Sequence, residues 1–311
     1  MKRKALGVDI GGTHIKSGIV DLDTGELHTS TVVSTKVDSK ATAEVIFEQW
    51  ASCINKSLET YNAEELLGIG FALPGPFNYQ TGIAYYSKND KYESLYGLKL
   101  IDHIRPLINI AEDRPFRFYN DASCFAIGED VYGSGTPYQK TISVTLGTGF
   151  GSAFLTNGFP VVKDNNVPDD GCLWHLPYGR GIADDYFSTR WFVNTYQDRT
   201  GNLVKGVKEL VDQYEQDKAI APLFDEFGRS LGTFLAPWIE RFAAEAVIIG
   251  GNIARSFDYF SDGFTSATGM TLATRIPFLK AHHWEDASII GSARLLDDEY
   301  YTVLKKYLPT Q

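Results

Sequence analysis

The feature that most constrains the fold of this chain is an apolar strand that runs directly into a glycine turn, and it occurs three times. Glycine adopts positive φ readily and lets the backbone approach a ligand closely, so consecutive N–H groups at such a turn can point at phosphate oxygens. Taken singly, each turn is more typical of a plain connection between two strands. The three turns are Gly11-Gly12-Thr13 after the strand 5–10, Gly147-Thr148-Gly149 after 141–146, and Gly250-Gly251-Asn252 after 246–249.

The elements around the first turn predict a mixed sheet with helices on its faces. Strands at 5–10, 15–20 and 26–36 are followed by an amphipathic helix at 43–58 and a buried strand at 67–73. Three strands, then a helix and a further strand, are typical of the α/β class.

The second half of the chain repeats this order, although its residues are not a close repeat of the first. Strands at 141–146 and 151–156 precede a helical tract at 223–242 and a strand at 246–249. Pro237 lies inside the helical tract and predicts a kink or a break there. Two related lobes are therefore expected. They are a small N-terminal lobe at 1–119, completed by the C-terminal helix 287–311, and a large C-terminal lobe at 120–286.

Composition narrows the setting in which the chain works. With 311 residues and 43% hydrophobic content it can bury the cores of two lobes. Its cysteines, Cys53, Cys124 and Cys172, form no CxxC pair, which fits a reducing compartment without disulfides. No apolar run approaches the ~20 residues that span a bilayer, and the first strand leaves no room for a signal peptide. A net charge of −10 argues against binding of nucleic acid by the protein surface. We expect a cytoplasmic protein with neither a membrane nor a nucleic acid as partner.

Asp9 distinguishes the first glycine turn from a simple connection. Its carboxylate ends a strand just before Gly11-Gly12-Thr13, where it is well placed to orient a hydrated Mg²⁺ beside phosphates. Thr13 adds a hydroxyl at the same corner. The Walker pattern is absent, because the string 133–141 lacks the glycine before its lysine. The segment 147–151 is no dinucleotide fingerprint either, because it opens a strand and not a helix.

Asn120 and Asp121 follow the apolar stretch 116–119 and precede a helical run. One interpretation is a helix N-cap, which Asn and Asp often form. The other is that Asp121 accepts the proton of an attacking hydroxyl while Asn120 helps to hold a sugar, since phosphoryl transfer needs positioning, charge neutralisation and one base. The two interpretations are compatible.

With these pieces in order, the sequence resembles the ROK family of bacterial sugar kinases and sugar-responsive repressors, in the actin-like ATPase superfamily. The resemblance extends over nearly the whole chain, and five motifs in the right order make it specific. They are a first phosphate motif at 6–13, a sugar-contacting loop at 73–76 with Asn89 downstream, a catalytic segment at Asn120-Asp121-Ala122, a second phosphate motif at 146–151 and an adenosine motif at 249–253.

The resemblance implies a two-lobed actin-like (ribonuclease H-like) α/β fold, with mixed sheets flanked by helices and a cleft between the lobes for ATP and sugar. It implies transfer of the γ-phosphoryl group of ATP to a hexose hydroxyl, usually the 6-hydroxyl. Asp121 would be the general base, and Asp9 would hold Mg²⁺ through water. The sugar contacts would be Asn89, Asn120, His175 and Asp184. The ATP contacts would be Asp9, Gly11, Gly12, Thr13, Gly147, Thr148, Gly149, Gly250, Gly251 and Asn252.

The segment 171–184 departs from the family pattern. His175 and the Gly179-Arg180-Gly181 string remain, but the zinc cysteines of the family do not, and a tetrahedral zinc site needs about four N or S ligands. We therefore expect no structural zinc. Two sugar-binding glutamates are replaced by Cys172 and Asp184. Cys172 is open to interpretation as a small buried hydrophobe, and Asp184 as a helix cap.

Two alternatives within the family remain. A repressor would need an N-terminal helix-turn-helix, but no residues for one precede the first strand of this chain. The negative net charge of the chain is also wrong for binding DNA. A sugar-binding sensor that has lost catalysis is the stronger rival, because of the two glutamate replacements. Retention of Asp9 and Asp121 favours the enzyme. A homodimer is compatible with the sequence, which does not decide the oligomeric state or the sugar.

Overall fold

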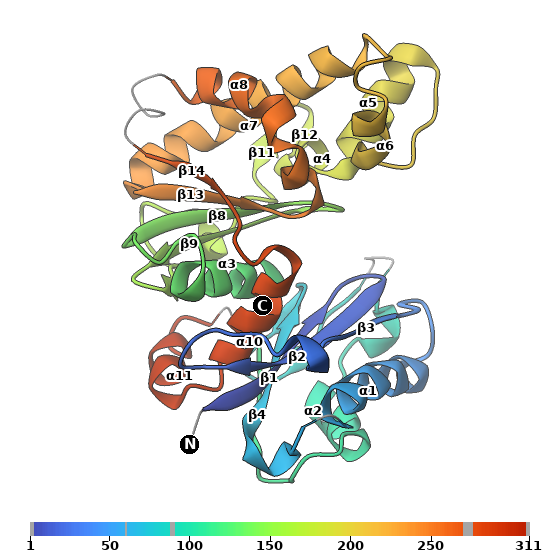
Figure 1. Cartoon of the computed structure of the whole chain (residues 1–311), viewed down its shortest axis with the longest axis vertical. Helices are drawn as coiled ribbons and strands as arrows, with labels where there is room; N and C mark the ends of the chain where they lie inside the picture. The colour runs from blue at the N-terminus through green and yellow to red at the C-terminus, as the bar shows by residue number, and fades with distance from the viewer. Residues whose placement is uncertain (1–2, 60, 88–90, 270–275, 309–311) are drawn as a thin grey trace. The chain divides into compact units, whose positions relative to one another are not determined.

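The computed structural model describes residues 3–59, 61–87, 91–269 and 276–308, and the chain divides into two compact units (Figure 1). Unit 1 comprises Met1–Gly133 and Glu285–Gln311, and unit 2 comprises Ser134–Trp284. The lobe boundary expected at 119/120 differs from this division, because the helix that begins at Asp121 packs within unit 1 against the C-terminal segment.

The sheet of unit 1 combines an antiparallel meander with two parallel strands. Its order is β3-β2-β1-β4-β7, with β2 antiparallel to both β1 and β3, and with β4 parallel to both β1 and β7. The expected strand 26–36 is shorter in the structure, where a 3₁₀ turn at Thr29–Thr31 precedes β3. The strands are β1 (Lys4–Ile10), β2 (His14–Asp21), β3 (Val33–Lys36), β4 (Leu66–Leu73) and β7 (Phe116–Asn120), with a separate small hairpin of β5 (Phe77–Asn78) and β6 (Ile83–Ala84).

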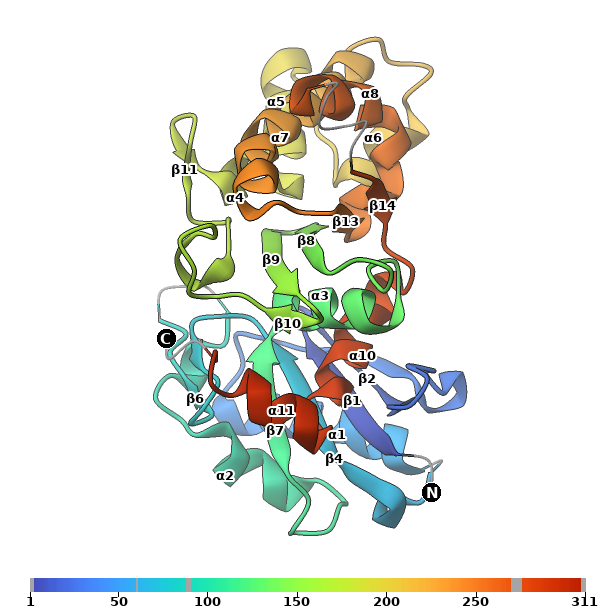
Figure 2. The ribbon, with the colours of Figure 1, turned by 90° about the vertical axis from the view of Figure 1, so that its left-hand side faces the viewer.

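Glycines allow the helix α10 to lie directly on the sheet of unit 1. A Cβ at Gly7 of β1 would overlap the backbone of Ile289, and one at Gly70 of β4 would overlap Ser292. Figures 1 and 2 both show α10 beside β1, while α1 packs against β2 and β3. The helices of this unit are α1 (Ala43–Glu59), α2 (Leu100–Ile104), α3 (Asp121–Tyr132), α10 (Ala287–Arg294) and α11 (Asp298–Leu304).

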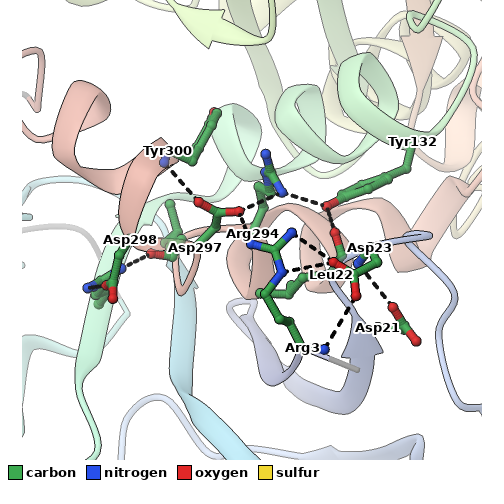
Figure 3. Close-up of polar contacts among 11 residues, drawn as sticks. Arg3, Asp21, Leu22, Asp23, Tyr132, Arg294, Asp297, Asp298 and Tyr300 are labelled. Atoms are coloured by element: carbon green, nitrogen blue, oxygen red, sulfur yellow. Dashed lines mark hydrogen bonds and ion pairs between the residues drawn. The ribbon is translucent and has the colours of Figure 1, made fainter. Parts of the chain in front are cut away.

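A cluster of charged side chains joins the first strand of unit 1 to its C-terminal segment (Figure 3). Asp297 is 5% exposed and lies 2.8 Å from an Arg3 nitrogen and 3.0 Å from an Arg294 nitrogen. Arg3 also pairs with Asp23 at 2.8 Å, and Arg294 donates to the Tyr132 hydroxyl at 3.1 Å. Burial alone would raise the pKa of Asp297, but the N–H of a helix start and two arginines surround its carboxylate, so that this pKa is lowered.

The sheet of unit 2 has the same topology. Its order is β10-β9-β8-β13-β14, with β9 antiparallel to β8 and β10, and β13 parallel to β8 and β14. The strands are β8 (Lys140–Leu146), β9 (Phe150–Thr156), β10 (Phe159–Pro160), β13 (Ala246–Gly250) and β14 (Phe278–Lys280), with a separate hairpin of β11 (Pro177–Tyr178) and β12 (Gly181–Ile182).

The helices of unit 2 bury an aromatic-rich core that includes Phe187, Phe192, Phe227 and Phe260. Helix α7 runs unbroken past Pro237, so the structure shows no break there, and it packs along α8 (Figure 1). The helices are α4 (Ala183–Tyr186), α5 (Thr189–Thr200), α6 (Val207–Asp212), α7 (Ile220–Phe242) and α8 (Phe257–Thr268). Short 3₁₀ helices in the two units are Ala63–Glu65, Glu93–Leu95, Arg105–Leu107, Asp169–Gly171, Asn252–Ser256 and Trp284–Asp286. Within the described ranges, no helix combines the length and apolarity that crossing a bilayer requires.

Candidate functional site

Asp9 and Asp121 lie at one edge of the unit 1 sheet. Asp9 is near the end of β1, and Asp121 directly follows β7, which runs in the same direction two strands away. The pKa of Asp9 is raised to about 7, first by burial and then by the negative charge of Asp121, while Lys16 opposes both. Burial also raises the pKa of Asp121, against the hydrogen bond from the Ala122 N–H at 2.8 Å. The fold therefore brings together the two carboxylates that the sequence singled out.

Asn120 orients the Asp121 carboxylate and caps the helix that follows. Its Oδ1 accepts from the Ser123 N–H at 3.0 Å, so the N-cap interpretation describes its amide oxygen. Its Nδ2 donates to Asp121 Oδ1 at 3.1 Å and faces the Tyr79 hydroxyl at 3.4 Å. One side chain thus fixes both the start of α3 and the rotamer of the candidate base.

The first glycine turn carries an ammonium group that sequence reasoning did not identify. A Cβ at Gly12 would lie 2.6 Å from both Cε and Nζ of Lys91, so the lysine side chain packs directly on this glycine. The positive charge of Lys91 also lowers the pKa of Asp121, although burial has the larger, opposite effect. Within the turn, Gly11 N–H donates to His14 O at 2.9 Å, and Thr13 Oγ1 lies 2.9 Å from His14 Nδ1.

Three buried tyrosines, which the sequence motifs did not point to, fix the loops around these carboxylates. Their hydroxyls donate to backbone carbonyls of the first glycine turn, of the last residue of β4 and of the loop after it. The bonds are Tyr92 to Gly11 at 2.6 Å, Tyr79 to Leu73 at 3.1 Å and Tyr86 to Pro74 at 3.1 Å. No spacing or motif marks them, and the bond from Tyr92 to Gly11 joins segments far apart in the sequence. Asn89, expected to contact sugar, lies outside the described residues.

The second glycine turn, in unit 2, is held by side chains that precede and begin α5. Gly147 O accepts from both the N–H and the hydroxyl of Thr189, at 2.8 and 2.9 Å. Asp184, expected to contact sugar, accepts from the Phe150 N–H at 2.7 Å through Oδ1. Its Oδ2 pairs with Arg190 at 2.7 Å. Thr148 and Gly149 remain exposed at the tip of the turn.

The third glycine turn requires glycine at its centre. Gly251 has φ +83°, and a Cβ there would overlap the backbone of Leu146, where the second turn begins. Gly250 ends β13, and the exposed Asn252 starts the 3₁₀ helix that leads into α8. The second and third turns therefore lie side by side at the ends of the adjacent strands β8 and β13.

His175 lies beside Cys172 in unit 2. The Cys172 Sγ and His175 Nδ1 atoms are 3.7 Å apart, and Trp174, 48% exposed, packs edge-on against the histidine. Burial raises the pKa of the Cys172 thiol to about 11, so it is neutral at physiological pH. Over the described ranges of the chain, no group of three or more His, Cys, Asp or Glu side chains could hold a metal ion.

Known proteins resemble this chain along nearly its whole length. The chain is 25% identical over 321 residues to an N-acetyl-D-glucosamine kinase of Haemophilus influenzae, a match that covers 93% of this chain and 98% of that protein. Its fold matches the crystal structure of a ROK hexokinase from Thermus thermophilus with a TM-score of 0.77 at 20% identity, covering 96% and 99% of the two chains.

A second solved structure has the same fold. It is a ROK family glucokinase from Streptomyces griseus in complex with glucose and AMPPNP, with a TM-score of 0.74 at 22% identity over 94% of this chain and 98% of that one. The expected α/β fold, with mixed sheets flanked by helices, is confirmed. The family model described as "ROK family" matches residues 5–299. This chain therefore belongs to the ROK family.

Proposed function

We propose that this protein is an ATP-dependent sugar kinase that transfers the γ-phosphoryl group of ATP to a hydroxyl of a hexose or hexose derivative. Family membership supports the proposal, and so do the kinase activities named for its relatives. The observation that carries it is the pair Asp9 and Asp121 beside a glycine turn, with Asp121 held by Asn120.

Asp121 is the proposed general base. Its carboxylate accepts the proton of the sugar hydroxyl as that oxygen bonds to the γ-phosphorus, while the bond from this phosphorus to the β–γ bridging oxygen breaks and ADP leaves. The raised pKa of Asp121 makes it a better proton acceptor than an ordinary aspartate. Asn120 keeps the carboxylate in one orientation, and the 6-hydroxyl is the acceptor that the family resemblance implies.

Asp9 fits a magnesium site. Its carboxylate makes no hydrogen bond or ion pair to any residue in the described ranges, so its oxygens are available to water molecules around a cation. Mg²⁺, when bound, would neutralise charge on the phosphates. A partly buried carboxylate with a pKa of about 7 is also the kind of group that a cation would return to its charged form.

The proposed ATP contacts come from the three glycine turns. Unit 1 supplies Gly11, Gly12 and Thr13, to which the structure adds the ammonium of Lys91 as a positive charge for a phosphate. Unit 2 supplies Gly147-Thr148-Gly149 for phosphate and Gly250-Gly251-Asn252 for adenosine. Exposed turn residues such as Thr148 and Asn252 leave backbone groups accessible to a ligand.

For the sugar, we propose Asn120 and His175 as contacts, together with Asn89. Cys172, neutral and close to His175, cannot supply the charged acceptor that a glutamate would. A hydrogen bond to a charged group contributes ~1.5–3 kcal/mol, so its loss would weaken binding of plain glucose by about 10- to 150-fold. The substrate is then a substituted hexose, or glucose with a high KM. Magnesium as cofactor and a cytoplasmic location complete the proposal, the latter fitting three free cysteines.

The test is ADP release measured with a coupled assay over glucose, fructose, mannose, N-acetylhexosamines and β-glucosides under one set of conditions. Sugar-dependent ADP release supports the kinase, and the ranking of kcat/KM identifies the substrate. If calorimetry detects sugar binding while no sugar stimulates ADP release, the protein is a sensor and not an enzyme. An efficient reaction with plain glucose at low KM would refute the argument from Cys172.

A further inference from the structure

Asp184 uses both carboxylate oxygens within unit 2. Oδ1 accepts from the Phe150 N–H at 2.7 Å, at the residue that directly follows the second glycine turn. Oδ2 lies 2.7 Å from an Arg190 nitrogen. The Asp184 side chain is 23% exposed, whereas Arg190 is 55% exposed, so the carboxylate is the inner member of the pair.

The turn itself is shaped to receive this carboxylate. Oδ1 of Asp184 would lie 3.0 Å from a Cβ at Gly149, which is closer than an ordinary contact, so glycine is the residue that leaves it room. On the other side of the turn, Gly147 O accepts two hydrogen bonds from Thr189. One short segment, 184–189, therefore holds both ends of the turn. Asp184 accepts from the Phe150 N–H at one end, and Thr189 donates to the Gly147 carbonyl at the other.

The backbone of Asp184 is fixed as well. Its N–H donates to Trp174 O at 3.0 Å, and the next carboxylate, Asp185, turns the other way and accepts from the Ile182 N–H at 3.1 Å. Asp184 thus points at the turn while Asp185 caps α4. Two adjacent aspartates on one short helix have different partners, which provides a matched pair for experiment.

We infer that Asp184 is a positioning residue for the second phosphate turn and not a ligand of the sugar. With Thr189, it holds Gly147-Thr148-Gly149 in the conformation that binds the nucleotide phosphates. The inference rests on the proposed kinase function and assigns this residue to the nucleotide side of the reaction. In this structure each of its carboxylate oxygens already has a partner within unit 2, the Phe150 N–H for Oδ1 and Arg190 for Oδ2.

The first experiment compares Asp184→Asn with Asp184→Ala in steady-state kinetics, with each substrate varied in turn. The asparagine keeps an oxygen for the Phe150 N–H but loses the ion pair, so KM for ATP should rise severalfold. The alanine leaves that N–H without its partner, and KM for ATP should rise about tenfold or more. KM for the sugar should stay within about twofold in both, since neither change touches the sugar.

A second variant acts on the opposite end of the turn. Thr189→Val removes the hydroxyl that donates to Gly147 O but keeps the backbone N–H, and it should raise KM for ATP severalfold with KM for the sugar unchanged. Asp185→Asn is the matched control, because its carboxylate faces Ile182, and both KM values should stay within about twofold of wild type. Thermal melts check that each variant folds.

AMPPNP binding by calorimetry separates this inference from the proposed function. Wild type that binds AMPPNP but phosphorylates no sugar would refute the kinase proposal, while weaker AMPPNP binding by Asp184→Ala would still support the positioning of the turn. A folded Asp184 variant whose KM for the sugar rises more than its KM for ATP would overturn the inference. So would unchanged AMPPNP affinity in both Asp184→Ala and Thr189→Val.

Discussion

The two units share a sheet topology but differ in the residues at the ends of corresponding strands. β1 of unit 1 and β8 of unit 2 each have an antiparallel partner on one side and a parallel partner on the other, and each ends in a glycine turn. The penultimate residue is Asp9 in β1 and Thr145 in β8. Unit 1 therefore carries a carboxylate on the strand itself, whereas the carboxylate beside the turn of unit 2, Asp184, comes from a later helix.

The partners of these carboxylates differ too. Asp9 and Asp121 of unit 1 are partly buried, interact electrostatically with each other and have raised pKa values. Asp184 of unit 2 instead forms an ion pair with Arg190, and its other oxygen accepts from the Phe150 N–H. If the proposed roles hold, one sheet architecture carries reactive carboxylates in one copy and a carboxylate that positions a turn in the other. Four predictions address the two units, beginning with the largest effect.

Asp121→Asn should lower kcat by roughly 100-fold or more while preserving the fold, because the amide cannot accept the proton of the sugar hydroxyl. The measurement is kcat with saturating ATP and sugar, with circular dichroism and sugar affinity as controls. Asp184→Asn is the matched change in unit 2, and it should leave kcat far less affected. Near-normal kcat in Asp121→Asn would remove the distinction between the two units.

Gly70→Ala should destabilise unit 1 by about 2 kcal/mol or more, because its Cβ would overlap the backbone of Ser292 in α10. Chemical denaturation measures the effect. Gly147→Ala is the control for stability, since nothing lies within 4 Å of a Cβ there. Equal stabilities of the two variants would show that α10 moves away from the sheet at little cost.

Lys91→Met should raise KM for ATP about tenfold, because it removes a positive charge packed on Gly12 at the first turn. Lys91→Arg should recover part of the loss. The control is Lys163→Met, which removes the same charge from the segment of unit 2 that follows β10 and should leave KM unchanged. If both methionine variants behave alike, the ammonium acts only through the net charge of the protein.

Asp9→Asn should raise the melting temperature of the ligand-free protein by a few degrees at pH 8, and by less at pH 5. The pKa of Asp9 is about 7 in the folded protein, above that of an unfolded aspartate near 4. Between these values the folded state binds more protons than the unfolded state, so stability falls as the pH rises through this window. The Asp9→Asn variant has no carboxyl group at this position, so it does not lose this stability as the pH rises. Melting curves of wild type and variant without Mg²⁺ at both pH values measure the difference in melting temperature. A difference that does not grow with pH would contradict the raised pKa of Asp9.

Much of the fold and part of the site could be predicted from local sequence. Strands that end in glycine turns gave the positions of β1, β8 and β13, and a carboxylate or amide at the end of a strand pointed to Asp9 and Asn120. These are features of neighbouring residues, and parallel strands then bring their ends to one edge. The first lobe boundary could not be predicted in this way, because α3 is held in unit 1 by α10, far away in sequence.

The contacts of Lys91, Tyr92 and Asp184 were also beyond local reasoning. Each acts on a glycine turn more than thirty residues away in sequence, namely Lys91 and Tyr92 on the first turn and Asp184 on the second. A lysine, a tyrosine and an aspartate are ordinary surface or core residues until the fold supplies their partners. For Asp184, the resemblance suggested a sugar contact, whereas the hydrogen bonds connect it to Phe150 and Arg190.

The charged cluster of Arg3, Asp297 and Arg294 has a consequence for how the chain is made. Unit 2 is one continuous segment, whereas unit 1 needs both the first strand and the segment 285–311. During synthesis on a ribosome, the sheet strands of unit 1 emerge before unit 2 but lack the helix that covers Gly7 and Gly70, and unit 1 stays incomplete until the segment 285–311 has been translated. Unit 2 can therefore finish folding before the first-synthesised strand has met its last partners.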